Sequence, residues 1–322
     1  MVDIVRYFNY YKQLIQGKIM KKILAILLAA FALTATAAET ITIVYSWTAA
    51  DQAANYWRNL AESANAQQKK YNFIVDYKPG AGGTVAANHI QTTKNAIQAT
   101  SSAFYIRANL YPSSYDLDKF QSVMTMCLAP FSISSAKYKS WDEVPTDKPL
   151  TIGISGLGTT THLAAIQLAK KYPNMDIVPF KSTSEAVQAT LGGQTDFAVG
   201  FVGDSIQYQG DNLTHKKSNI LGISGSRSID GRPLLINQGF PKILGKFGSL
   251  FQAIAPASMP EQQYKEISQI LSKATKSKKV AEATDSDYCF YNAEMAEMTR
   301  PKFYEWSRAM WKELTAGVKV NQ

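Results

Sequence analysis

Short apolar runs alternate with amphipathic runs in the first third of the chain. Apolar, β-prone runs at 40–45 and 73–75 and a short unit at 99–102 are separated by helix-compatible runs at 51–64 and 85–91. Strand and helix signals that alternate in this way favour a mainly parallel sheet covered by helices.

A second series of the same kind begins near Leu150. One of its helices has an apolar face of alanine and leucine and an opposite face of Gln167, Lys170 and Lys171, which is the pattern of a helix packed on a sheet. The expected strands are 150–154, 176–180, 197–201 and 219–223, and the expected helices are 162–171, 184–191, 261–275 and 293–314. The whole pattern predicts an α/β protein of two domains joined by a hinge, with C-terminal helices that return to the first domain.

The N-terminal region carries the signals of export. Met20-Lys21-Lys22 precede an apolar run at 23–33, and an Ala-x-Ala site follows at 35–37. These features predict a cleaved signal peptide at 20–38 and a periplasmic protein. The apolar run is shorter than the roughly 20 residues that a bilayer requires, and a buried N-terminal helix is the alternative. Because the signal is complete from Met20, we expect residues 1–19 to be an artefactual extension.

The net charge and the spacing of the cysteines favour some classes of ligand and disfavour others. The chain has 34 basic and 25 acidic residues, and the 284 residues after Ala38 keep 29 and 24 of them, a net charge of +5. This mild charge is spread along the chain, so it suits a small organic anion and lacks the basic stripe that nucleic acid requires. Cys127 and Cys289 either pair in an oxidising compartment or remain buried thiols, and they lack metal-ligand spacing.

A glycine-rich turn links the apolar run 71–77 to the helix-compatible run 85–91. Its sequence, Pro79-Gly80-Ala81-Gly82-Gly83, lets the backbone approach a ligand, and the N–H groups at the following helix start favour anions. Val85 occupies the place of the third glycine in a dinucleotide fingerprint, and no Gly-Lys-Ser/Thr follows. The turn is therefore either a different anion site or a simple tight turn.

The segment Pro79 to Asn88 resembles the signature of the Bug-type solute receptors of tripartite tricarboxylate transporters. Five further segments are similar to this family, in its order: 108–120, 152–164, 178–196, 232–241 and 255–260. The resemblance covers most of the chain after residue 38. It implies a two-lobed, type II periplasmic-binding-protein-like fold, with lobe one at 39–138 plus 245–322 and lobe two at 139–244.

The resemblance also implies how such a protein works. Ligand, a small carboxylate, lies in the cleft between the lobes and is held by loop backbone, hydroxyls and ordered water. The lobes close on it, and the closed form delivers it to membrane permease subunits. The receptor is expected to be a monomer without a cofactor.

Candidate ligand-binding residues come from strand ends and helix starts, where open α/β sheets place their ligands. Thr159, Thr160 and Thr161 begin a helix, where hydroxyls and N–H groups converge. For each candidate the structural alternative is a cap, a turn, a solvated lysine or core packing. The full set is Trp47, Thr48, Asp51, Gly82, Gly83, Thr84, Ser101, Ser102, Gly158, Thr159, Thr160, Thr161, His162, Lys181, Phe201 and Asp204.

The first loop, 46–51, departs from the family pattern. The family carries Pro-Gly-Gly before an aspartate, whereas this chain has Ser46-Trp47-Thr48-Ala49-Ala50 before Asp51. Trp47 either forms a wall of the cleft or is buried in the core. The departure implies a ligand that is bulkier or less carboxylate-like than is usual in the family.

Two other functions compete with the receptor. An enzyme is disfavoured because neither Gly153-Ile154-Ser155-Gly156 nor the similar run at 222–226 completes a Gly-x-Ser-x-Gly elbow. His89, His162 and His215 show no metal spacing. No catalytic residue is assigned.

A periplasmic sensor that presents its ligand to a membrane kinase would use the same two-lobed form, so the sequence does not separate sensing from transport.

Overall fold

The computed structural model describes residues 6–13, 15–17, 21–22, 38–112, 114–209, 217–286, 288–289 and 300–318. The chain forms two units, 1–39 and 40–322. In the first unit, residues 6–13 and 15–17 are helical. The expected signal peptide lies outside the described residues, apart from residues 21–22 and 38. No helix in the described part of the chain has both the length and the apolar character needed to cross a bilayer.

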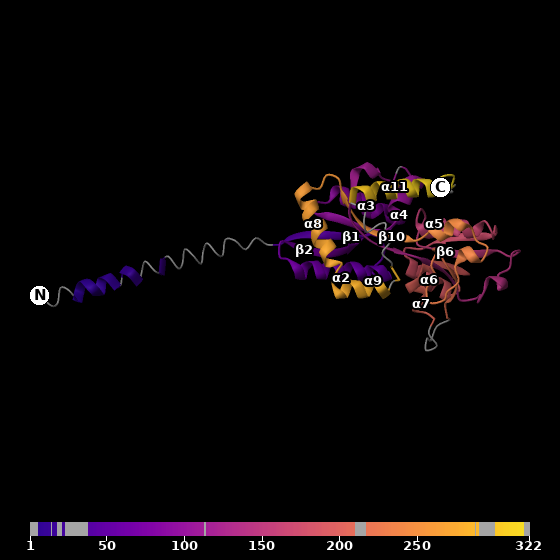
Figure 1. Ribbon diagram of the computed structural model, residues 1–322, viewed down its shortest axis with the longest axis horizontal. Helices are drawn as coiled ribbons and strands as arrows, with labels where there is room; N and C mark the ends of the chain where they lie inside the picture. The colour runs from indigo at the N-terminus through magenta and orange to yellow at the C-terminus, as the bar shows by residue number, and fades with distance from the viewer. Residues whose placement is uncertain are drawn as a thin grey trace. The chain divides into compact units, whose positions relative to one another are not determined.

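The first of two five-stranded sheets has the order β2-β1-β3-β10-β4 (Figure 1). Its strands are β1 (Glu39–Tyr45), β2 (Tyr71–Tyr77), β3 (Ala96–Thr100), β4 (Phe120–Ala129) and β10 (Ser249–Pro256). Helices α2 (Gln52–Gln67), α8 (Glu261–Ala274) and α9 (Lys278–Ser286) pack together beside this sheet. Helices α3 (Thr84–Thr92), α4 (Ala103–Leu110) and α11 (Arg300–Thr315) lie on the opposite side in Figure 1.

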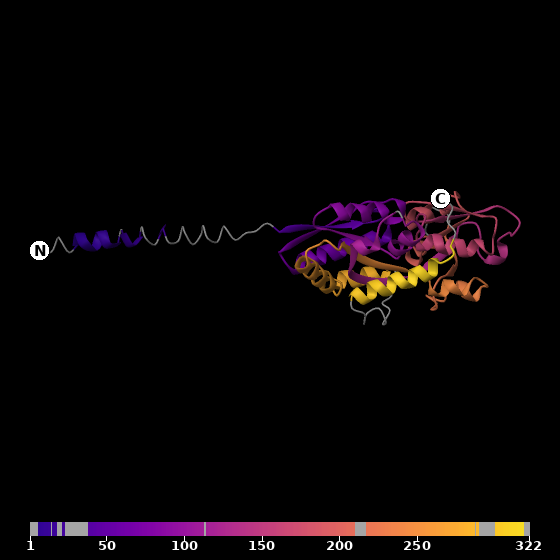
Figure 2. The ribbon, with the colours of Figure 1, turned by 90° about the horizontal axis from the view of Figure 1, so that it is seen from above.

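The C-terminal helices return to this first sheet, as the sequence predicted. Helix α11, yellow in Figure 1 and Figure 2, packs on α4 and β4. Tyr304 of α11 donates a hydrogen bond to the carbonyl of Leu117 at 2.7 Å. Helix α8 packs on α2 and β4.

The second sheet has the order β7-β6-β8-β5-β9. Its strands are β5 (Phe131–Ser135), β6 (Leu150–Ile154), β7 (Met175–Pro179), β8 (Phe197–Phe201) and β9 (Asn219–Ile223). Its helices are α5 (Thr160–Ala169), α6 (Thr183–Leu191) and α7 (Val202–Ile206). In Figure 1, α5 lies on one side of β6, and α6 and α7 lie on the other. We call the first sheet with its helices lobe one, and the second with its helices lobe two.

The sheets are mixed rather than mainly parallel, which corrects the expectation from the sequence. β1 pairs with β3, and β6 with β7 and β8, in parallel. β10 runs antiparallel to β3 and β4, and β5 runs antiparallel to β8 and β9. The antiparallel strands are those next to the connections between lobes. The chain enters lobe two at Pro130, before the expected boundary at residue 138, because β5 belongs to the second sheet.

Cys127 and Cys289 form a disulfide, so the alternative of two free thiols is excluded. Cys127 of β4 is bonded to Cys289, with their Cα atoms 5.3 Å apart and 162 residues apart in sequence. Both side chains are buried, at 0% and 5% exposure. The closed loop therefore contains the whole of lobe two.

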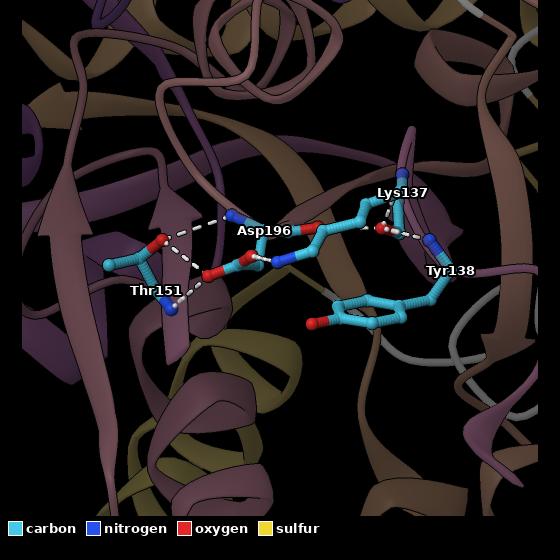
Figure 3. A network of polar contacts seen from close by, with 5 residues as sticks. Lys137, Tyr138, Thr151 and Asp196 are labelled. Atoms are coloured by element: carbon cyan, nitrogen blue, oxygen red, sulfur yellow. Dashed lines mark hydrogen bonds and ion pairs between the residues drawn. The ribbon is translucent and has the colours of Figure 1, made fainter. Parts of the chain in front are cut away.

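One polar network ties three strands of lobe two together (Figure 3). The Asp196 carboxylate accepts hydrogen bonds from the Thr151 N–H at 3.0 Å and the Thr151 hydroxyl at 3.1 Å, and it pairs with Lys137 at 2.9 Å. Ser135 donates to the Asp196 carbonyl at 2.7 Å. The network lies at the start of β6 and β8 and at the end of β5, so we interpret Asp196 as structural.

Removing that carboxylate is expected to destabilise lobe two. Asp196→Ala leaves the Thr151 donors without their acceptor, which should lower the free energy of unfolding by about 1–3 kcal/mol. Lys137→Ala is the control, because Lys137 is 63% exposed and such surface pairs contribute at most about 1 kcal/mol. Urea unfolding of both variants measures this difference, and equal losses would contradict the role given to Asp196.

Candidate functional site

Two adjoining cavities lie between the lobes, at the carboxyl ends of the parallel strands. The inner cavity is a narrow gap, and the outer cavity is larger and more open to solvent. The inner cavity is lined by Tyr45, Trp47, Asp51, Ser101, Ser155, Thr159, Thr160, Thr161, Thr183, Phe201, Ser249 and Phe251. The outer cavity is lined by Ser46, Trp47, Gly80, Ala81, Gly82, Arg107, Ser155, Gly156, Leu157, Pro179, Phe180, Lys181 and Glu185. Strand ends of both lobes therefore meet where open α/β sheets bind ligands.

The start of α5 supplies a group of hydroxyls, Ser155, Thr159, Thr160 and Thr161, that we call the hydroxyl cluster. Thr159 is the N-cap and accepts from the His162 N–H at 3.2 Å. The Thr161 Oγ1 lies 2.8 Å from the Thr159 Oγ1 and 2.9 Å from the Ser155 Oγ. Hydroxyls can turn their protons toward a ligand, and the first N–H groups of a helix lack intrahelical acceptors. The cluster is thus suited to an anionic oxygen.

Contacts between side chains close the inner cavity across the two lobes. The Thr160 Oγ1 of α5 lies 3.3 Å from the Ser249 Oγ of β10. The rings of Phe201 and Phe251, also from opposite lobes, have centroids 5.2 Å apart. Because these contacts join the second sheet to the first, the structure shows the lobes in a closed arrangement.

The glycine turn of lobe one touches a loop of lobe two. Gly82 has a φ of +60°, and a Cβ on it would lie 2.7 Å from the Leu157 carbonyl oxygen. Arg107 of α4 donates to that same oxygen at 3.1 Å, and its guanidinium lies 3.8 Å from the centre of the Tyr111 ring. The turn, Arg107 and Leu157 thus form a second contact between the lobes.

The structure places nine of the sixteen predicted site residues on the two cavities. Trp47, Asp51, Ser101, Thr159, Thr160, Thr161 and Phe201 line the inner cavity, and Trp47, Gly82 and Lys181 line the outer one. Trp47 therefore forms a wall of both cavities and is also buried, since only 6% of its surface is exposed. These residues remain our candidates for contact with ligand.

The other seven predicted residues lie outside the cavity linings: Thr48, Gly83, Thr84, Ser102, Gly158, His162 and Asp204. The Ser102 hydroxyl accepts from the Leu250 N–H at 2.8 Å, and the Gly83 carbonyl accepts from Gln98 at 3.1 Å. Local hydrogen bonding to the protein itself explains these two placements.

Two ionisable candidates are also used inside the protein. Burial, with a smaller contribution from the Arg107 charge, lowers the pKa of His162 to about 4, and its Nδ1 accepts from the Gly158 N–H at 3.1 Å. Asp204 accepts from the Ser184 hydroxyl at 2.8 Å and from the Phe201 N–H at 3.3 Å, and burial raises its pKa. Both side chains support the loops behind the cavity.

Several lining residues were missed by the sequence analysis: Tyr45, Ser155, Thr183, Ser249, Phe251 and Arg107. Ser155 and Tyr45 adjoin motifs or strand ends that were recognised, so the strand-end rule could have included them. Ser249 and Phe251 come from β10, which carried no recognised signal. Among the described residues, no group of three or more His, Cys, Asp or Glu side chains could hold a metal, and His215 lies outside them.

Two α/β lobes with cavities between their strand ends form a type II periplasmic-binding-protein-like fold. The periplasmic binding protein BugD has this fold, with a TM-score of 0.75 and 19% identity over 86% of this chain and 96% of that one. MatC from Rhodopseudomonas palustris, solved with bound malate, gives 0.72 and 18% over 86% and 98%. These likenesses confirm the predicted fold.

Comparison with known sequences finds a relative that matches about half of the chain. No family model matches the chain. The chain is 28% identical over 172 residues to a UPF0065 protein from Cupriavidus necator, which is 48% of this chain and 50% of that protein. The chain thus spans about half the length of this curated relative. The resemblance to Bug-type proteins agrees with the likeness in fold to BugD, a periplasmic binding protein.

Proposed function

We propose that this protein is a Bug-type periplasmic receptor that captures a small organic anion, a carboxylate, between its lobes and delivers it to the membrane permease subunits of a tripartite transporter. The observation that carries the proposal is the hydroxyl cluster at the start of α5, which lines a cavity closed by the other lobe. The predicted signal peptide at 20–38 supports a periplasmic location. MatC, which has the same fold, was solved with a dicarboxylate.

Ligand binding would proceed by lobe closure. Arg107 and Lys181 line the outer cavity and attract an anion toward it. The hydroxyl cluster then receives the carboxylate inside, where the described lining contains no lysine, arginine or histidine. A ligand shifts the lobes toward the closed form only as far as it binds that form more tightly, and contact with both lobes supplies that difference.

A thermal-shift screen tests the proposed function. Protein comprising residues 39–322 is unfolded, refolded to remove bound ligand, and screened against mono-, di- and tricarboxylates, amino acids and neutral amides. A ligand at about 100 times its Kd adds about 2.7 kcal/mol of stability, so a carboxylate hit is readily seen. Stabilisation by neutral compounds alone, or by nothing in the panel, would contradict a carboxylate receptor.

The double variant Thr160→Ala/Thr161→Ala tests the hydroxyl cluster. Hydrogen bonds to a charged group contribute about 1.5–3 kcal/mol each, so we expect the Kd for the carboxylate found in the screen to rise roughly ten- to hundredfold. Thr190→Ala is the matched control, because Thr190 is a buried lobe-two threonine bonded to Thr195 at 2.7 Å and lines neither cavity. Calorimetry measures both variants. Unchanged affinity in the double variant would remove α5 from the site.

A further inference from the structure

The outer cavity offers more room for a ligand than the inner one. Its volume of about 480 Å³ lies within the range of about 300–1,000 Å³ typical of small-molecule pockets, whereas the inner cavity is a narrow gap. Ser155 of the hydroxyl cluster lines both cavities. A ligand whose carboxylate reaches the hydroxyl cluster at Ser155 would therefore have its other atoms in the outer cavity, where the lining selects what else the ligand carries.

The described lining of the outer cavity contains two cationic side chains, and they come from opposite lobes. Arg107 belongs to α4 of lobe one, and Lys181 follows β7 of lobe two. Neither forms an ion pair within the part of the chain that the structure describes. Glu185 is the acidic residue of this lining, and its carboxylate accepts from the Lys181 backbone N–H at 3.1 Å. The lining therefore has a net positive charge.

Arg107 is held in place by contacts that leave most of its N–H donors unused. Its guanidinium lies 3.8 Å from the centre of the Tyr111 ring, and its Nη1 donates to the Leu157 carbonyl at 3.1 Å. Its Nε is buried and has no acceptor among the described residues, which is costly for a charged donor. A guanidinium has five donors in a planar fork that matches a carboxylate. Arg107 is thus already oriented and keeps donors for an anionic group.

Gly158 of lobe two makes room for the Arg107 side chain. A Cβ on Gly158 would lie 2.8 Å from the Arg107 Cδ and 3.0 Å from the Tyr111 ring, and its φ of +73° favours glycine. The stem of Arg107 therefore passes between the Tyr111 ring and the backbone of the other lobe. This position brings one cation of lobe one into contact with lobe two and with the cavity.

We propose, building on the receptor function above, that Arg107 is a specificity-determining residue that binds a second anionic group of the ligand by direct ion pairing. The first carboxylate lies on the hydroxyl cluster, and the second group lies in the outer cavity on the Arg107 guanidinium, with Lys181 adding charge from lobe two. Because Arg107 also bonds to the Leu157 carbonyl of lobe two, this ion pair belongs to the closed form. Resemblance to the family implies a different mode, in which loop backbone, hydroxyls and ordered water hold the ligand.

Calorimetry with two pairs of probes tests this role on refolded protein of residues 39–322. Succinate and glutarate carry two carboxylates, whereas succinamate and glutaramate carry a neutral amide in place of one of them. We expect a dicarboxylate to bind roughly ten- to hundredfold more tightly than its half-amide, because it gains hydrogen bonds to a charged group. Half-amides that bind as tightly as the dicarboxylates would overturn this inference and leave the carboxylate receptor intact. Binding of none of the four would also overturn it, while the broader screen above decides the receptor function separately.

Arg107→Gln separates ion pairing from lobe closure. Loss of the Leu157 contact alone should weaken the dicarboxylate and its half-amide equally, because both need the closed lobes. Loss of the ion pair weakens the dicarboxylate more, so we expect the ratio of the two affinities to fall about tenfold or more. Arg308→Gln is the matched control, because it removes the same charge from lobe one at a residue that lines neither cavity. An unchanged ratio in Arg107→Gln would overturn the role given to Arg107.

Lys181→Gln provides a second test that leaves the Arg107 contact with Leu157 in place. Lys181 is exposed, so the variant should fold, and the ratio of dicarboxylate to half-amide affinity should fall by at most about fivefold, as is typical of an exposed ion pair. If Arg107→Gln fails to fold, this variant decides the outcome, and an unchanged ratio would then overturn the ion pairing.

Discussion

Replacing both cysteines of the disulfide, in Cys127→Ala/Cys289→Ala, is expected to lower the free energy of unfolding by about 2–5 kcal/mol. The bond closes a loop between residues 162 positions apart, and long loops gain most from closure because the unfolded chain loses more freedom. Both sulfurs are buried in the core shared by α2, α8 and α9. The bond therefore holds the segment after α9 against β4.

Urea unfolding followed by circular dichroism measures this loss. Wild-type protein unfolded in excess reducing agent is the control, and it should approach the stability of the double variant. A double variant within about 0.5 kcal/mol of the oxidised wild type, the range of neutral surface changes, would show that the bond adds nothing to stability.

Among variants in which alanine replaces a glycine, Gly82→Ala is expected to lower ligand affinity most. The new Cβ would lie 2.7 Å from the Leu157 carbonyl oxygen of the other lobe, so the closed form must shift to admit it. Overpacking of this kind costs about 1–3 kcal/mol, which corresponds to a Kd raised roughly five- to 150-fold. The open form carries no such clash, so the cost falls on closure.

Gly193→Ala provides a closely matched control for backbone strain. Gly193 has a φ of +80°, similar to the +60° of Gly82, but a Cβ there meets nothing within 4 Å. Both variants should lose stability through left-handed alanine, whereas only Gly82→Ala should lose affinity. Calorimetry with the ligand found in the screen, together with small-angle scattering of the ligand-bound forms, measures affinity and closure. Equal affinities in the two variants would contradict the Gly82 contact.

The β/α series could be predicted because its signals are local. Period and turn residues located β1, β2, β6 to β9 and the helices α2, α3, α5, α6 and α8 within a few residues, but they did not predict α4, α7 or α9. β4, β5 and β10 were missed, because their pairing joins residues far apart in sequence, such as Ser249 with Ala129. The disulfide could not be decided for the same reason, since nothing local brings Cys127 and Cys289 together.

Only part of the candidate site could likewise be predicted from the sequence. Strand-end reasoning found Thr159 to Thr161 and Ser101, which line the inner cavity. It also selected Ser102 and Asp204, whose side chains hydrogen-bond inside their own lobe instead. Sequence alone does not say which way a side chain at a strand end turns. Arg107 was missed because its partner, the Leu157 carbonyl, belongs to the other lobe.

The two connections between the lobes lie side by side, so they form a single hinge. Ser249 at the start of β10 pairs with Ala129 at the end of β4, and Gly248 packs so closely on Leu128 that a Cβ would lie 2.8 Å from it. Adjacent connections act as one pivot, so the lobes can rotate about a single line. The inner cavity takes Ser249 and Phe251 from this pivot strand, whereas the described lining of the outer cavity contains nothing from β4, β5 or β10. Rotation about this line is therefore expected to open both cavities together and to separate Gly82 from Leu157.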